Sequence, residues 1–221
     1  MIQEPRFVTF NLEGMNNTDK LVNSLLSNSI KFMNESVSNN PIDYKSMSGS
    51  DIEEFSLASM KEVASSVSFP KERIHLVRNH IFPDILLKET GYGVEIKSTQ
   101  KDAWTSTGSS IIESSRNEDV ERIYMLFGKL GGIPEFRCKP YQQCLSNIAV
   151  THAPRYLIDM NLDQEDSIFA KMQTEYDNFR QLPEADKISK VRKYYIDKAR
   201  KEKKHEMPWW MGETTKVNLS F

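Results

Sequence analysis

The chain has 221 residues, of which 38% are hydrophobic and 27% charged, with a formal net charge of −2. These values exclude a wholly disordered chain and allow one large domain, or one domain with an appendage. The net charge argues neither for nor against nucleic acid, because a partner reads the local distribution, and residues 187–204 hold nine bases and two acids.

The N-terminal residues and the cysteines bear on the cellular compartment. In a signal peptide, a positively charged segment is followed by a long apolar one, and the first residues, MIQEPRFVTF, do not show this pattern. No apolar run approaches the roughly 20 residues that span a bilayer. Cys138 and Cys144 match neither a zinc spacing nor a redox spacing, so two reduced thiols are expected. We therefore expect a cytoplasmic protein without a membrane partner.

A helix is expected near the start of the chain, followed by a loop. Residues 17–36 carry apolar side chains at roughly helical spacing, with Thr18 or Asp19 as the N-cap. The Asn- and Ser-rich residues 34–50 predict a loop.

A second helix is expected over residues 50–67. Ser50 stands three residues before Glu53, the spacing of a capping box at a helix N-terminus. Pro70 lies beyond the expected end of this helix.

Short stretches rich in Ile, Val, Leu, Tyr and Phe then predict strands at 73–77, 81–87, 92–98, 122–129 and 147–152. Residues 105–120 are long enough for a helical crossover, which would make strand 122–129 parallel to a neighbour. From Asp163 onward the pattern is helical. This order predicts an α/β fold: a mixed central β-sheet flanked by helices in residues 1–162, and a helical, basic extension in 163–221.

The stretch FPDILLKETGYGVEIK predicts a hairpin that gathers charged side chains. Gly91 and Gly93 supply turn flexibility, and a turn centred between Glu89 and Thr90 would place Asp84 directly opposite Glu95. Opposed residues point to the same face of a sheet, with Cβ atoms about 5 Å apart. Lys97, two residues after Glu95, would share that face.

This grouping favours a metal centre. Two carboxylates at such a short distance repel each other. Burial then raises the pKa of a carboxyl group unless a cation lies between the two. Mg²⁺ is commonly held by one or two carboxylates together with water and substrate phosphate. A neighbouring lysine can orient or deprotonate a water, or stabilise developing charge, so the group suits attack on a phosphodiester.

At these positions the chain resembles the PD-(D/E)xK nuclease superfamily, and within it most closely a type II restriction endonuclease. Pro83-Asp84 and Glu95-Ile96-Lys97 match the motif literally, on the predicted neighbouring strands that the family uses. The resemblance implies that Asp84 and Glu95 bind Mg²⁺ and that Lys97 assists the attacking water. The match covers about residues 81–98; beyond them only the order of elements is similar.

The resemblance further implies an endonuclease that hydrolyses phosphodiester bonds of double-stranded DNA, by in-line attack of a metal-activated water without a covalent intermediate. A palindromic target would call for a two-fold symmetric homodimer. Two alternatives remain open. One is a repair or recombination nuclease with the same centre. The other is a catalytically silent DNA-binding or interaction protein, in which the three residues only brace a hairpin and their side of it is solvated.

Several polar residues are candidates for contact with DNA. Ser98, Thr99, Gln100 and Lys101 follow the expected third strand, and their groups are donors to phosphate oxygens. Arg155 follows the expected last strand, and arginine is well shaped for contact with guanine. Each of these could equally belong to an ordinary polar loop. His152 lies beside Arg155, and a structural role is the alternative for it as well.

Two further features have plain alternatives. The superfamily often has a further acid on the preceding helix, a position that Glu54 or Glu62 would fill, but a solvated helix face explains both. The basic run 187–204 predicts either a solvated amphipathic helix or a surface for the DNA backbone with salt-dependent affinity.

Overall fold

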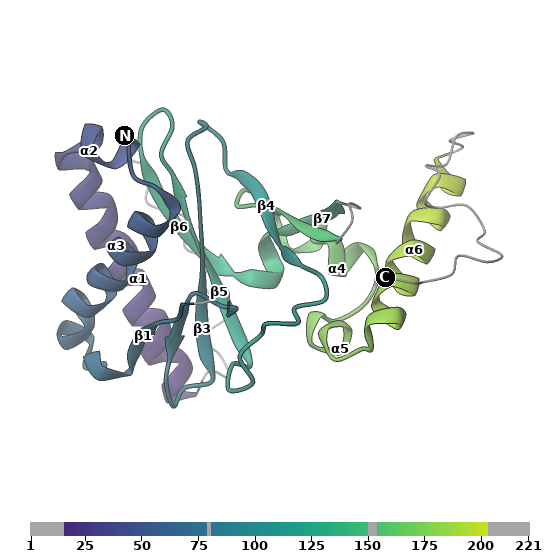
Figure 1. Cartoon of the computed structure of the whole chain (residues 1–221), viewed down its shortest axis with the longest axis horizontal. Coiled ribbons are helices and arrows are strands. Elements are labelled where there is room, and N and C mark those ends of the chain that lie inside the picture. Colours follow the sequence, from purple (N-terminus) through teal and green to yellow (C-terminus); the bar gives the residue numbers. More distant parts are fainter. Residues whose placement is uncertain (1–15, 79–80, 150–153, 203–221) are drawn as a thin grey trace. The chain divides into compact units, whose positions relative to one another are not determined.

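A computed structural model describes residues 16–78, 81–149 and 154–202. The chain divides into two compact units, Met1–Ile168 and Phe169–Phe221. The first unit holds both β-sheets and the long N-terminal helices, and the second unit is helical (Figure 1).

The first helix, α1 (Asn17–Asn39), begins earlier than the sequence suggested, because its N-cap is Asn16 and not Thr18 or Asp19. Asn16 is the N-cap: its side-chain oxygen accepts the Asp19 N–H at 2.9 Å, and the Asp19 carboxylate accepts the Asn16 N–H at 3.3 Å. Asp19 is therefore the third helical residue of a capping box. The helix continues to Asn39, and α2 (Pro41–Lys45) follows, so much of the expected loop is helical.

The next helix, α3 (Gly49–Ala64), is capped two residues before the position that the sequence suggested. Ser48 and Asp51 form its capping box, with the Ser48 N–H donating to the Asp51 carboxylate at 2.8 Å. The competing box of Ser50 and Glu53 was a wrong prediction, because Ser48 offers the same chemistry one half-turn earlier. Glu53 consequently takes no part in capping.

The main sheet has five strands in the order β1 (Ile74–Leu76), β2 (Ile85–Leu87), β3 (Tyr92–Thr99), β5 (Arg122–Lys129) and β6 (Glu135–Pro140). The pair β3–β5 is parallel and the other pairs are antiparallel. The expected mixed sheet and the expected parallel placement of residues 122–129 are therefore confirmed.

The connection between β3 and β5 is not the helical crossover that its length suggested. It contains β4 (Thr105–Ser110), the edge strand of a second sheet in the order β4, β8 (Arg155–Asp159) and β7 (Leu145–Ala149). The stretch TSTGSS carries no apolar helical stripe, and Ser, Thr and Gly are poor helix formers. Strands β4, β6 and β8 were not predicted. Strand β7 covers the start of expected strand 147–152, whose last three residues lie outside the described ranges.

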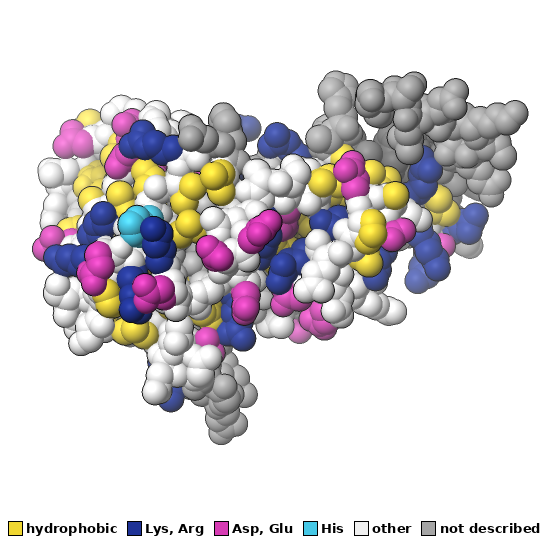
Figure 2. Space-filling view, turned by 60° about the horizontal axis from the view of Figure 1, so that its bottom comes forward, with side chains coloured by type: hydrophobic (Ala, Val, Ile, Leu, Met, Phe, Trp, Pro, Cys, Tyr) yellow, Lys and Arg dark blue, Asp and Glu magenta, His cyan; other side chains and the backbone are white. Residues whose placement is uncertain are grey.

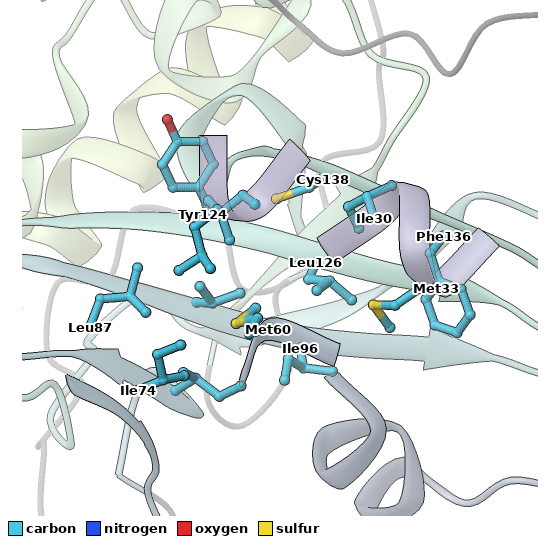
Figure 3. Packing of buried hydrophobic residues seen from close by; sticks show 14 of the residues in the cluster. Ile30, Met33, Met60, Ile74, Leu87, Ile96, Tyr124, Leu126, Phe136 and Cys138 are labelled. Atoms are coloured by element: carbon cyan, nitrogen blue, oxygen red, sulfur yellow. The ribbon is translucent and has the colours of Figure 1, made fainter. Parts of the chain in front are cut away.

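Helices α1 and α3 cover one face of the main sheet (Figure 1). Figure 3 shows Ile30 and Met33 of α1 and Met60 of α3 meeting Ile96 and Leu126 of the sheet in one hydrophobic cluster. All five of these side chains are at most 4% exposed. Because side chains alternate along a strand, Glu95 and Lys97 lie on the opposite face.

The opposite face is partly covered by the second sheet. Met125 and Phe127 of β5 are fully buried there, and the ring of Phe127 lies 5.9 Å from that of Trp104. Lys139 of β6 donates to the carbonyl of Leu162 at 2.5 Å. These contacts lie on the β5–β6 side of the face, and the β2–β3 side carries the acidic residues of the hairpin.

The boundary between the units falls after Ile168, the first residue of α4 (Ile168–Lys171). The second unit contains the remaining residues of α4, together with α5 (Tyr176–Arg180) and α6 (Glu184–Lys201). The rings of Tyr176 and Phe179 pack against Phe169 at 5.2 and 5.5 Å. Lys187, the first base of the basic run, is buried, so not every base of α6 faces solvent. Within the ranges described, no helix has the length and apolar character that crossing a membrane demands.

Candidate functional site

The site is built on the hairpin of β2 and β3. Ile85 pairs with Val94, Leu86 with Gly93 and Leu87 with Tyr92. These three pairs confirm the register expected from the sequence, and Asp84 immediately precedes β2, at the position that this register would set opposite Glu95. The turn depends on Gly91, whose φ of 74° lies in the left-handed region that glycine adopts without strain.

Asp84 is held where β2 begins. Strand β2 starts at Ile85, so within the described residues β3 has no strand partner on that side beyond Val94. The Ile96 N–H on this open edge donates to the Asp84 carboxylate at 2.7 Å. A backbone donor that would otherwise lack a ladder partner thus fixes the carboxylate beside β3.

Glu95 and Lys97 form an ion pair on the same face. The Lys97 ammonium lies 2.6 Å from Glu95 Oε1 and also donates to the Ile96 carbonyl oxygen at 3.1 Å. Glu95 is 4% exposed, and the Lys97 side chain is 29% exposed. The ammonium is therefore held between two oxygens, one of which belongs to a buried carboxylate.

The electrostatics follow from burial and from the neighbouring charges. Burial raises the pKa of Glu95, the Lys97 charge opposes this rise, and the charge and hydrogen bond of Asp84 add to it, for a value of about 7. Burial alone would lower the pKa of Lys97, but the charges of Glu95 and Asp84 outweigh it, so that pKa is raised. Lys97 is therefore an ammonium at neutral pH.

A third carboxylate approaches from α3. Burial raises the pKa of Glu53, the charge of Asp84 raises it further, and those of Lys97 and Arg78 act against the rise. Glu53 is thus a helical acid close enough to the hairpin for the charges of Asp84 and Lys97 to act on it. Sequence reasoning named Glu54 or Glu62 instead; Glu54 pairs with Arg78 at 2.7 Å, and Glu62 is exposed.

Glu53 was missed because the expected capping box assigned it to the helix N-terminus. The available signal was the competing pair Ser48 and Asp51, which has the same spacing as Ser50 and Glu53. With Asp51 as the capping acid, Glu53 lies in the second turn and is available to interact with the sheet.

The residues after Lys97 do not all join this group. Alternation along β3 places Ser98 on the helix-covered face with Ile96, and Thr99 on the face of Lys97. The Thr99 hydroxyl accepts the N–H of Lys101 at 3.2 Å. The side chain of Gln100 donates to the carbonyl of Met47 at 3.0 Å, so it is used in loop packing. Lys101 is exposed.

Arg155 lies at the start of β8 in the second sheet. It is exposed, and its guanidinium donates to the Gly108 carbonyl at 3.4 Å. His152 falls outside the described residues. Trp104, buried against Phe127, is a core residue.

A cavity of about 480 Å³ lies at the other end of the hairpin. Its lining includes Leu86, Lys88, Tyr92, Asn117 and Val120. None of the three charged hairpin residues lines it, so the cavity is separate from their group.

Comparisons with known proteins add no family. No protein-family model matches the chain, and no curated protein matches it significantly. The resemblance to PD-(D/E)xK nucleases therefore rests on the residues and on their arrangement alone.

Proposed function

We propose that this protein is a Mg²⁺-dependent endonuclease of restriction type that hydrolyses phosphodiester bonds of double-stranded DNA. The observation that carries the proposal is the placement of Asp84 opposite Glu95, with Lys97 on the same face, where β2 begins and the edge of β3 is open.

The charge of the group supports a divalent cation. Three carboxylates, Glu53, Asp84 and Glu95, face a single ammonium, that of Lys97. The carboxylates outnumber the ammonium, and carboxylate oxygens are the donors that the hard cation Mg²⁺ prefers.

The number of side-chain ligands limits how such an ion would be held. Within the described ranges, no three His, Cys, Asp or Glu side chains are arranged to hold a metal ion together. An ion at this site would therefore take Asp84 and Glu95 as its carboxylate ligands and water or substrate oxygens as the others, which is a common arrangement for Mg²⁺.

The residues would divide the chemistry between them. Bound Mg²⁺ would lower the pKa of a water and offset charge on the phosphoryl oxygens. Asp84, fixed by the Ile96 N–H, and the buried Glu95 would hold the ion. Lys97 would donate a hydrogen bond to the attacking water or to a phosphate oxygen, where developing negative charge is stabilised.

The test is a digest of plasmid DNA in Mg²⁺, paired with DNA binding in Ca²⁺, a cation that often occupies such sites without supporting turnover. Asp84→Asn keeps the shape of a ligand but removes its charge, and Lys97→Ala removes the ammonium. We expect each change to abolish cleavage, at least about a hundredfold, while DNA binding in Ca²⁺ persists, because the reaction occurs at the phosphate and not at base edges.

Asp102→Asn is the matched control. Asp102 forms a Lys–Asp ion pair of the same 2.6 Å length, with Lys129, and it is 65% exposed. This variant should cut at the wild-type rate. Discrete fragments would indicate a restriction enzyme, and nicks or a smear would indicate a repair nuclease. Wild-type protein that binds DNA but never cuts it in Mg²⁺ would favour the alternative of a catalytically silent DNA-binding protein, in which the three residues only brace the hairpin.

A further inference from the structure

Arg78 stands at the edge of the candidate site, one residue beyond the last backbone contact of β1. The Val77 N–H donates to the carbonyl oxygen of Asp84 at 2.7 Å, so the chain leaves the sheet beside this carboxylate. Arg78 is also close enough to Glu53 for its charge to act on that residue. Its position is therefore tied to two of the three acids.

The Arg78 guanidinium is held in place and remains accessible. Its Nη2 lies 2.7 Å from Glu54 Oε1, and the Arg78 side chain is 77% exposed. A guanidinium carries five N–H donors. Within the described ranges, the ion pair with Glu54 engages Nη2, which leaves the donors on Nε and Nη1 to meet an incoming anion.

Three other cations on this face of the sheet are less accessible. The side chains of Lys97, Lys129 and Arg137 are 29%, 11% and 27% exposed, and each is paired with a carboxylate. Acidic and basic side chains are interspersed over the face of the molecule in Figure 2. A polyanionic substrate that approaches three carboxylates is repelled unless a cation at the rim offsets the repulsion.

We infer that Arg78 binds a backbone phosphate of the substrate next to the one that is cleaved, with Glu54 as the positioning residue that holds the guanidinium toward it. Arginine suits this role because its planar fork matches phosphate oxygens in a bidentate geometry. The inference rests on the proposed function for the identity of the substrate, but Arg78 would act in binding and not in the bond-breaking step.

The test compares Arg78→Ala with Arg73→Ala in the full-length protein. Arg73 lies at the other end of β1 and is also paired with a glutamate, Glu89, at 2.5 Å. Binding to a short DNA duplex is measured in Ca²⁺ over a series of salt concentrations. The loss of one phosphate contact should reduce the salt slope by about one and weaken binding about eightfold near 0.1 M salt.

We expect this loss for Arg78→Ala and no change for Arg73→Ala. Arg78→Lys keeps the charge and should restore the salt slope. Thermal unfolding of each variant verifies that it is folded. An Arg78→Ala slope equal to that of Arg73→Ala would overturn the inference, as would an Arg78→Lys slope as low as that of Arg78→Ala. Mg²⁺-dependent cleavage by the wild-type protein tests the proposed function separately, so the two failures are distinguishable.

Discussion

At the scale of single residues, the candidate site depends on how a carboxylate is kept on a buried face. Glu95 is almost fully buried, and burial raises its pKa because the charged form loses its hydration. Lys97 offsets this at 2.6 Å, whereas Asp84 adds a second negative charge. A cation placed between the two carboxylates would therefore favour the charged form of Glu95.

Glu53 contributes a third negative charge from the helix. Glu53→Gln keeps the shape of the side chain and removes a carboxylate near the proposed Mg²⁺ site. We expect the Mg²⁺ concentration for half-maximal cleavage to rise roughly tenfold, with a nearly unchanged rate at saturating Mg²⁺, because outer carboxylates tune metal affinity. The measurement is cleavage rate against Mg²⁺ concentration, supported by calorimetric titration with Ca²⁺.

Glu62→Gln, an exposed change on the same helix, is the control and should leave both quantities unaltered. If Glu53→Gln responded to Mg²⁺ as Glu62→Gln does, Glu53 would have no role in metal binding. A rate that remained far below wild type at saturating Mg²⁺ would instead assign Glu53 to the chemical step.

At the scale of elements, α1 is anchored to the sheet by a polar contact at its first turn. The Tyr92 hydroxyl donates to the Asp19 carboxylate at 2.6 Å, and Arg122 donates to the same oxygen at 3.0 Å. The hydrogen bond from Tyr92, together with the capping bond and Arg122, lowers the pKa of Asp19 against the effect of its burial. The helix that covers the core is thus joined to β3 and β5 through one ionised group.

Asp19→Asn should destabilise the protein by roughly 1–3 kcal/mol at neutral pH, because the Tyr92 hydroxyl and the Arg122 guanidinium would then donate to a neutral, weaker acceptor. A carboxylate with a lowered folded-state pKa stabilises the protein above its unfolded-state pKa. This stabilisation is lost as pH falls through the lowered folded-state pKa. Wild-type stability should therefore drop more steeply in acid than that of the variant. Urea unfolding over a pH series measures both effects.

Asp51→Asn is the matched control for this change. Asp51 occupies the same capping-box position in α3, but it is exposed and is bonded to Ser48 without a tyrosine or arginine partner among the described contacts. Its replacement should cost less stability. An equal loss for both variants would show that Asp19 acts only as a capping residue.

At the scale of the whole molecule, the first unit is layered, and its layers position the site. Helices cover one face of the main sheet, and the second sheet covers the β5–β6 side of the other face (Figure 1). The residues Asp84, Glu95 and Lys97 lie on the part of this face that belongs to β2 and β3.

A restriction-type enzyme that reads a palindrome has a two-fold symmetric assembly, because each half of the site then meets an identical surface. We therefore expect a homodimer of about twice 25.6 kDa. Light scattering of the full-length protein at several concentrations, with and without duplex DNA, measures its mass. A monomer in both conditions would argue against recognition of a palindrome by two copies.

Local patterns in the sequence were sufficient for the hairpin and for much of the main sheet. The apolar runs around Gly91 and the length of the turn determined the register, so Asp84 was placed opposite Glu95 before any tertiary contact was known. A strand pairing across a tight turn depends only on residues that are near one another in the chain. Side-chain alternation then put Lys97 on the face of Glu95.

Other features were decided by contacts between distant segments. Residues 105–110 have little helical or strand preference of their own, and pairing with β8 made them a strand. Glu53 comes near the hairpin residues because α3 packs against β1 and β3. Arg78 lies beside Asp84 because β1 pairs with β2. The sequence by itself determined which groups lie on the hairpin. Only the tertiary structure decided which charges from elsewhere meet them, because long-range packing brings together residues whose separation in the chain carries no periodic signal.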